Sequence, residues 1–198
     1  MNYERVLSYG NIFQLGLQCD PQKLRKEIAN FSFAKYNPNK DINRYGLSIT
    51  SLDGEMNGPD LDTLNGKDYD ELDFTELTEV YYKSKEAQKV IEPFLPWLGR
   101  THFLNIKKGG YFPPHRDEVS GKQEAFRIIV PLHHFNPPHN YMIYNDEVVR
   151  LNEGYAYFMN TNIVHGNFSF SNDTLMMIMN IKANKFSFKE LLKNMHDI

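Results

Sequence analysis

The part of the sequence that most limits the fold is residues 101–183, where short runs rich in β-branched and aromatic residues recur. Turn-forming residues separate these runs, as at Gly109-Gly110, Asn136-Pro137-Pro138 and Glu153-Gly154. The runs read THFLNIK, FRIIVPLHHF, YMIYND, EVVRLN, YAYFMN, VHGNFSFS and LMMIMNIKA. Short, regularly spaced strands of this kind are typical of a β-sandwich or barrel. We therefore predict a jelly roll, in which two antiparallel sheets pack together.

Residues 1–100 mix helix and strand patterns and predict a support region ahead of the jelly roll. Asp20 and Pro21 open a predicted helix, QKLRKEIANF, because Asp is a favoured N-cap and Pro suits the first turn. A second helix is predicted from about Ser84 to Phe94. Strands are predicted at 31–34 and 45–50, a long surface loop at 51–73 and a C-terminal helix at 186–195.

These elements predict a single domain, 1–198, of the α+β class and mainly β. Within it, 1–100 is the support region, 101–183 the jelly-roll catalytic core and 184–198 a C-terminal helical segment. A chain of 198 residues is long enough for one domain with a sizeable core.

Composition narrows the class of protein further. The net charge is −3, from 22 basic and 25 acidic residues, so no nucleic-acid partner is expected. The one cysteine, Cys19, permits no disulfide within the chain and fits a reducing compartment. No run approaches 18 apolar residues, and the first residues lack the apolar region of a signal peptide. A cytoplasmic protein with no membrane partner is therefore expected.

A short motif in residues 109–118, GGYFPPHRDE, carries the predicted chemistry. It places His115 and Asp117 two residues apart, and residues i and i+2 of a strand point to the same face. A third ligand, His165, follows 48 residues after Asp117, at the start of a late strand. Two imidazoles and one carboxylate on one face form the facial triad of non-heme iron oxygenases. The alternative is that His115 and Asp117 lie in a surface turn after Pro113-Pro114.

A second signal is Arg127, which stands in the apolar run FRIIVPL. Strand alternation puts it on one face with Ile129 and Pro131, and Phe126, Ile128 and Val130 on the other. A buried arginine requires an anionic partner, and its planar guanidinium suits a carboxylate. That partner is either a ligand carboxylate or an acid of the chain, such as Glu118 or Glu147.

With these motifs in place, residues Asn105–Ile181 resemble the Fe(II)/2-oxoglutarate-dependent oxygenases. The similarity is greatest to their aspartyl/asparaginyl β-hydroxylase and proline-hydroxylase-like branch. The resembling pieces are the glycine turn leading to PPHRDE, then FRIIVPL, the Gly154 turn and the His165 strand. The resemblance implies a double-stranded β-helix, which is a form of jelly roll.

The resemblance also implies roles for individual residues. His115, Asp117 and His165 match the iron ligands, and Arg127 matches an arginine that binds the cosubstrate. Many relatives carry a basic residue about ten positions after the last histidine, but here Thr174 and Leu175 stand there. We therefore expect other side chains to help Arg127 bind 2-oxoglutarate, with Asn105 and Tyr141 as the candidates.

The implied function is that of an Fe(II)- and 2-oxoglutarate-dependent dioxygenase, an oxidoreductase that uses O2 to hydroxylate an amino acid. The amino acid is either free or a side chain of a peptide or protein. Arg44 and Tyr45, at the start of a predicted strand, are candidate substrate-binding residues. Two alternatives stay open: a cupin-like metal- or ligand-binding protein without catalysis, and a metal hydrolase or isomerase, since the same ligands suit zinc.

Overall fold

The computed structural model describes residues 2–40, 42–58, 69–117 and 124–195, and they form a mainly β jelly roll of the α+β class. A seven-stranded antiparallel sheet has the order β1-β11-β8-β13-β6-β3-β2, and a four-stranded sheet has the order β10-β9-β12-β7. The strands of the large sheet are β1 (Ile12–Gln18), β2 (Ala34–Lys35), β3 (Arg44–Ser48), β6 (Leu98–Ile106), β8 (Ala125–His133), β11 (Tyr155–Met159) and β13 (Thr174–Lys182). Those of the small sheet are β7 (Tyr111–His115), β9 (Asn140–Tyr144), β10 (Glu147–Val149) and β12 (His165–Ser169). The predicted jelly roll is confirmed.

Side-chain alternation along the strands divides the apolar core into two parts. On β8, Phe126, Ile128 and Val130 pack with the helices on the outer face of the large sheet. Ile129 faces the other way and packs between the two sheets, with residues such as Met142 of β9. The alternation predicted for FRIIVPL is thus confirmed, and it directs Arg127 toward the space between the sheets.

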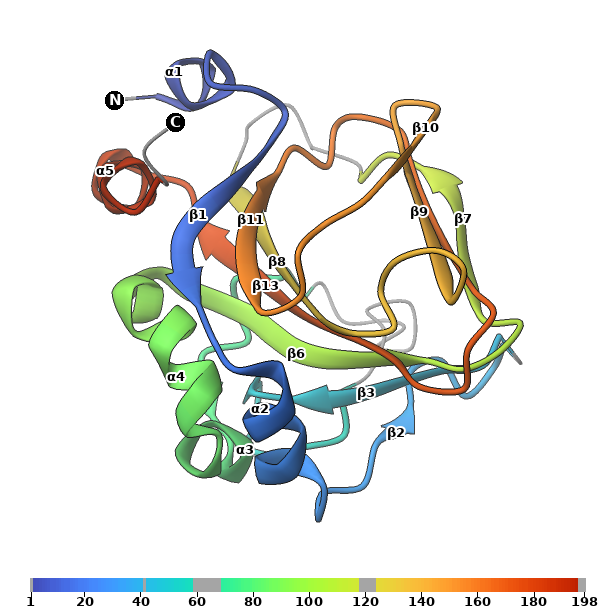
Figure 1. The fold of residues 1–198 in the computed structure, drawn as a ribbon. Helices are drawn as coiled ribbons and strands as arrows, with labels where there is room; N and C mark the ends of the chain where they lie inside the picture. Colours follow the sequence, from blue (N-terminus) through green and yellow to red (C-terminus); the bar gives the residue numbers. More distant parts are fainter. Residues whose placement is uncertain (1, 41, 59–68, 118–123, 196–198) are drawn as a thin grey trace.

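The helices lie against the outer face of the large sheet, and the small sheet lies on its other side (Figure 1). Their bounds are α1 (Tyr3–Leu7), α2 (Pro21–Ile28), α3 (Glu79–Lys83), α4 (Lys85–Ile91), the 3₁₀ helix η2 (Glu92–Trp97) and α5 (Lys185–Lys193). Asp20 caps α2 as predicted, accepting hydrogen bonds from the N–H groups of Gln22 and Lys23. The predicted helix at 84–94 is present as α4 and the start of η2. Pro96 has no backbone N–H with which to continue the α-helical hydrogen bonds.

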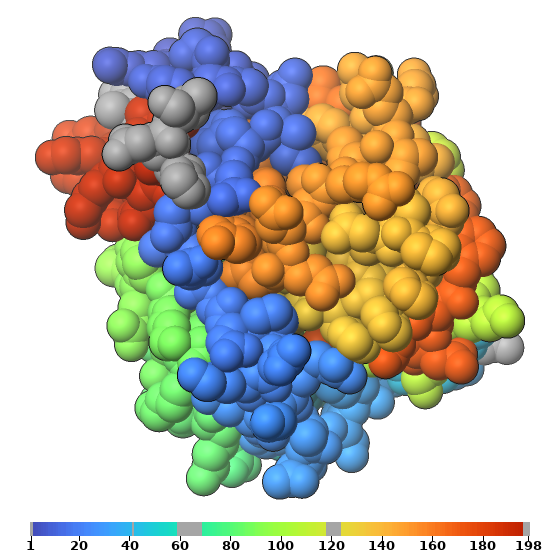
Figure 2. Space-filling view, in the orientation of Figure 1, coloured from blue at the N-terminus to red at the C-terminus, as the bar shows by residue number. Residues whose placement is uncertain are grey.

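The two ends of the described chain meet on one side of the molecule. Helices α1 and α5 are in contact, and the Tyr3 and Phe188 rings are 6.0 Å apart. Figure 2 shows this contact from outside, with dark blue α1 beside red α5. No helix within the described ranges is both long enough and apolar enough to span a membrane.

Two strands of the first hundred residues differ from the prediction. Strand β1 was not predicted, because IFQLGLQ has only partial alternation and Gly16 weakens the strand pattern. It pairs at the edge of the large sheet with β11, and the register shifts between Gln14 and Gln18. The strand predicted at 31–34 was misplaced, since only Ala34 and Lys35 pair with β3. The predicted loop at 51–73 lies partly outside the described residues, at 59–68.

Candidate metal centre

The three predicted ligands come from β7, the residues directly after it, and β12, and the two strands lie next to each other in the small sheet. His115 ends β7 and His165 begins β12, and the two are direct partners in the antiparallel register. Asp117 lies two residues beyond the end of β7, so the strand carries only the first ligand. Its backbone N–H donates to the carbonyl of Thr161 at 3.1 Å, which fixes it beside the chain leading into β12.

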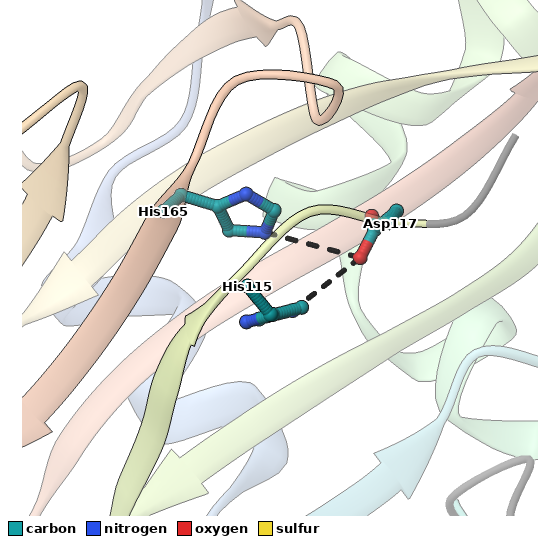
Figure 3. Close-up of side chains that lie close together, drawn as sticks. All are labelled: His115, Asp117 and His165. Atoms are coloured by element: carbon teal, nitrogen blue, oxygen red, sulfur yellow. Dashed lines mark ion pairs between the residues drawn. The ribbon is translucent and has the colours of Figure 1, made fainter.

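The ligand atoms of these three side chains converge (Figure 3). Asp117 Oδ1 lies 3.4 Å from Nε2 of His115 and 3.9 Å from Nε2 of His165. The two imidazole rings are 4.4 Å apart and inclined at 47°. One ligand atom from each residue lies within 4.8 Å of the other two, a spacing compatible with one shared metal ion.

Backbone carbonyls set the tautomer of both histidines. His115 Nδ1 lies 2.7 Å from the carbonyl oxygen of Pro113, and His165 Nδ1 lies 2.9 Å from that of Ile163. A carbonyl only accepts, so in each ring Nδ1 carries the hydrogen and donates it. In the neutral form of each ring the lone pair is therefore on Nε2, the atom that faces Asp117, and this is how metal-binding histidines are commonly oriented.

The charges in the site favour an ionised carboxylate and shift the pKa values of the two imidazoles in opposite directions. Burial acts to raise the pKa of Asp117, but the Arg127 guanidinium and the hydrogen bond with His115 outweigh it and lower the pKa below its usual range. The hydrogen bond with Asp117 raises the pKa of His115. Burial lowers the pKa of His165, which favours the neutral ring that a metal requires.

Arg127 lies beside this site, but its donors are directed at acids of the chain. Its Nη1 forms an ion pair with Asp117 Oδ2 at 2.6 Å, and its Nη2 lies 3.6 Å from Glu71 Oε1. Its Nε donates to Asn180 Oδ1 at 3.1 Å. The expected carboxylate partner is present, yet it belongs to Asp117 and Glu71 rather than to Glu147, which is exposed on β10. Glu118 lies outside the described residues.

A cavity of about 790 Å³ opens between the sheets beside the three ligands. Both cationic and acidic side chains line it, together with aromatic and apolar residues from both sheets. Among the lining residues are His115, Asp117, His165, Arg127, Arg44, Arg100, His102, Glu71, Tyr36, Phe112, Leu104, Met176 and Asn167.

Three of the predicted binding residues do not line this cavity. Asn105 follows Leu104 on β6, and because Leu104 faces the cavity, alternation turns Asn105 away from it. Tyr141 precedes Met142 on β9 and lies instead beside Phe168 and Phe170 on the outer face of the small sheet. Tyr45 packs against Lys107, whose Nζ lies 4.1 Å from the ring centroid. Arg44 does line the cavity and is buried.

Sequence reasoning missed Glu71, Arg100 and His102. Arg100 Nη1 pairs with Glu71 Oε1 at 3.4 Å, and its Nη2 donates to the Tyr36 hydroxyl at 2.9 Å. A signal for two of them was present, since Arg100, His102 and Leu104 alternate along β6 and so share one face. Glu71 follows a loop, where no periodicity marks it.

His133, the last residue of β8, and His134 form a second cluster with Asp173. His133 Nε2 lies 3.1 Å from Asp173 Oδ2, and His134 Nδ1 lies 2.7 Å from Oδ1. Arg25 Nη1 lies 3.2 Å from His133 Nδ1. Because arginine only donates, His133 accepts on Nδ1 and donates from Nε2, so it keeps no lone pair for a metal. The cluster is a hydrogen-bonded clamp between α2, the end of β8 and the chain before β13.

Comparison with known proteins gives similarity in fold. No family model matches the sequence, and no curated protein matches it. HygX from Streptomyces hygroscopicus, solved with nickel and 2-oxoglutarate bound, superposes with a TM-score of 0.56 at 9% identity, over 93% of this chain and 88% of HygX. An oxidoreductase of the 2OG-Fe(II) oxygenase family from Burkholderia pseudomallei gives a TM-score of 0.46 at 12% identity, over 82% of this chain and 77% of that one. KdgF from Halomonas sp. gives a TM-score of 0.34 at 17% identity, over 46% of this chain and 73% of KdgF. The chain therefore shares the fold of HygX.

Proposed function

We propose that this protein binds Fe(II) through His115, Asp117 and His165 and is a 2-oxoglutarate-dependent dioxygenase. Its substrate is an amino acid, free or as a side chain of a peptide, which it hydroxylates in the cytoplasm. The observation that carries the proposal is the convergence of two Nε2 lone pairs and one carboxylate oxygen beside a large cavity. Two histidines and one carboxylate leave coordination positions open on iron, as oxygenases require. The fold shared with HygX, which was solved with 2-oxoglutarate, adds support.

The residues fit a bound iron in the ligand atoms that they direct toward one another. Each histidine donates from Nδ1 to a carbonyl and so presents Nε2, while Arg127 holds Oδ2 of Asp117 and leaves Oδ1 toward the histidines. Iron, with 2-oxoglutarate and O2, would supply the oxidising chemistry. The chain supplies the three ligands and a cavity beside them that can receive the substrate.

The polarity of the cavity supports a zwitterionic or peptide substrate. Arg44, Arg100 and Lys40 line it together with Asp70 and Glu71. Side chains of both signs suit a molecule that carries an ammonium and a carboxylate group. Arg44 is the predicted substrate-binding residue that lies in this lining.

The test is formation of succinate from 2-oxoglutarate by protein reconstituted with Fe(II), with and without O2. We expect succinate to form only when O2 is present, and to form at a low rate even without added substrate. His115→Ala should form none. The matched control is His139→Ala, because His139 is exposed and lies outside the cavity. Succinate formation that persists in His115→Ala, or none in the wild type with any amino acid tried, would contradict the proposal.

A further inference from the structure

A buried histidine without hydrogen bonds lies in the wall of the cavity. His102, on β6, is only 2% exposed, and neither of its ring nitrogens has a hydrogen-bond partner within the described part of the chain. Burial, with the charges of Arg100 and Arg127, lowers its pKa well below the usual range, so the ring is neutral. A neutral imidazole offers one N–H donor and one acceptor, and both are unused here.

A second buried polar group lines the same cavity. Asn167, on β12, is 8% exposed, and its Oδ1 has no hydrogen-bond partner among the residues described. It pairs in register with Phe112, near the start of β7, and stands two residues after His165 on β12. Buried polar groups are nearly always hydrogen-bonded, because an unpaired one destabilises the folded state. His102 and Asn167 together therefore point to a polar ligand.

Arg44 supplies a positive charge at the same wall. Its guanidinium carbon lies 3.9 Å from the Phe112 ring centroid and 5.4 Å from that of Tyr36. The Tyr36 ring in turn stacks on His102, with centroids 5.6 Å apart. The Tyr36 ring thus contacts both Arg44 and His102, and Phe112, which packs on Arg44, is the register partner of Asn167.

We propose that His102 and Arg44 form a carboxylate subsite in this cavity, separate from the metal ligands, and that Asn167 accepts a hydrogen bond from the same ligand. Arginine pairs well with carboxylates, and the His102 N–H adds a neutral donor. Asn167 Oδ1 only accepts, so it suits an N–H or O–H group of the ligand and not the carboxylate itself. The inference rests on the proposed function, because it takes the other end of the ligand to lie at a metal bound by His115, Asp117 and His165. The carboxylate has two possible sources: the second carboxylate of a dicarboxylic 2-oxo acid, or a carboxylate of another organic acid.

Calorimetry on full-length protein loaded with Mn(II) tests the first source, the second carboxylate of a dicarboxylic 2-oxo acid. The ligands are 2-oxoglutarate and 2-oxobutyrate, which lacks the second carboxylate. We expect Arg44→Met and His102→Phe each to weaken 2-oxoglutarate binding roughly 10- to 100-fold, the range for losing a hydrogen bond to a charged group. Binding of 2-oxobutyrate should not change. Arg150→Met is the matched control, because Arg150 is exposed and lies outside the cavity.

Succinate tests the second source, since it is a dicarboxylate without the chelating 2-oxo group. In metal-free protein it should raise the melting temperature of the wild type, and less so that of Arg44→Met or His102→Phe. If the two variants lose the stabilisation by succinate but bind 2-oxoglutarate like the wild type, the subsite binds a carboxylate from a molecule other than the 2-oxo acid. If both variants bind 2-oxoglutarate and succinate like the wild type, the subsite does not exist.

Failure of the subsite can be told apart from failure of the proposed function. Failure of Mn(II) to bind, or Mn(II) binding that persists in His115→Ala, contradicts the iron site and leaves the succinate experiment intact. Both subsite variants are conservative in packing: Phe fills the space of His102, and Met keeps the apolar contact of Arg44 with Phe112. A rise in the unliganded melting temperature of His102→Phe, together with weaker binding, identifies a ligand-binding rather than a structural role.

Discussion

At the scale of single residues, the ion pair between Arg127 and Asp117 determines how the carboxylate is presented. The guanidinium holds Oδ2 at 2.6 Å, so Oδ1 is the oxygen that faces the two histidines. Without this partner, Asp117 would be a partly buried carboxylate free to rotate. Partners that orient a metal ligand are often nearly as important as the ligand itself.

We therefore predict that Arg127→Met weakens metal binding. Loss of a residue that orients a ligand typically lowers metal affinity roughly 10- to 100-fold. Titration of Mn(II) into the wild type and the variant measures this. Arg25→Met is the matched control, because Arg25 pairs with His133 and Asp173 outside the cavity. Unchanged Mn(II) affinity in Arg127→Met would leave Arg127 free for the predicted role in binding 2-oxoglutarate.

The buried His102 has a consequence for stability at acidic pH. Its pKa is lowered in the folded protein by burial, then by Arg100 and Arg127, from a value of 6.5. Because the unfolded chain binds a proton here more readily, the free energy of unfolding falls as the pH drops below about 6.5. We predict that His102→Phe raises the melting temperature and reduces its decline between pH 7.5 and pH 5.5. His139→Phe, at an exposed position, should not reduce that decline.

The residue scale also shows what the sequence can and cannot predict. The two-residue spacing of His115 and Asp117 and the late His165 identified side chains that the structure brings together. Asn105 and Tyr141 were placed wrongly in the cavity, because alternation separates the two faces of a strand without saying which face is inside. Their neighbours Leu104 and Met142 are the ones that line it.

At the scale of elements, the contact between β7 and β12 holds two of the three ligands at a fixed separation. Gly166 directly follows His165, and a Cβ there would lie 3.1 Å from the Phe112 carbonyl oxygen and 3.2 Å from the Pro114 nitrogen. Both are backbone atoms, and the proline ring makes the second one rigid. A side chain at this position therefore pushes the two strands apart.

We predict that Gly166→Ala weakens Mn(II) binding and lowers the free energy of unfolding by about 1 kcal/mol, the typical effect of one destabilising substitution. Chemical denaturation and Mn(II) titration measure the two effects. Gly16→Ala is the matched control, since the nearest atom to its Cβ would lie at an ordinary 3.6 Å, on edge strand β1. Equal Mn(II) affinity in both variants would show that strand spacing does not control the site.

The elements themselves were predictable where their patterns are strong. The runs of residues 101–183 gave strands with bounds close to the observed ones, and the Asp20-Pro21 pair marked the start of α2. Strand β1 and the two-residue β2 were not predictable in the same way, because edge strands depend on pairing with a distant partner. For β1 that partner is β11, more than a hundred residues later in the chain.

At the scale of the whole molecule, the site joins the two sheets. Its histidines belong to the small sheet, while Asp117 is held by Arg127 of β8 in the large sheet. The sequence predicts the jelly roll but not the order of its strands, because local periodicity does not say which distant strands pair. A metal ion bound here would connect β7 and β12 and, through Asp117, β8.

A metal that binds only the folded protein must stabilise the whole molecule. At a concentration 100 times the dissociation constant, the gain is about 2.7 kcal/mol, or a rise in melting temperature of roughly 5–10 °C for a chain of this size. We predict such a rise with Mn(II), or with Fe(II) in the absence of O2, and its reversal by a chelator. His165→Ala should abolish the rise, because it removes a ligand that no nearby side chain replaces among those described. His134→Ala should retain it, since His134 belongs to the clamp around Asp173. The reverse pattern would place the metal at that clamp, and so would contradict both the iron site and the proton assignment of His133.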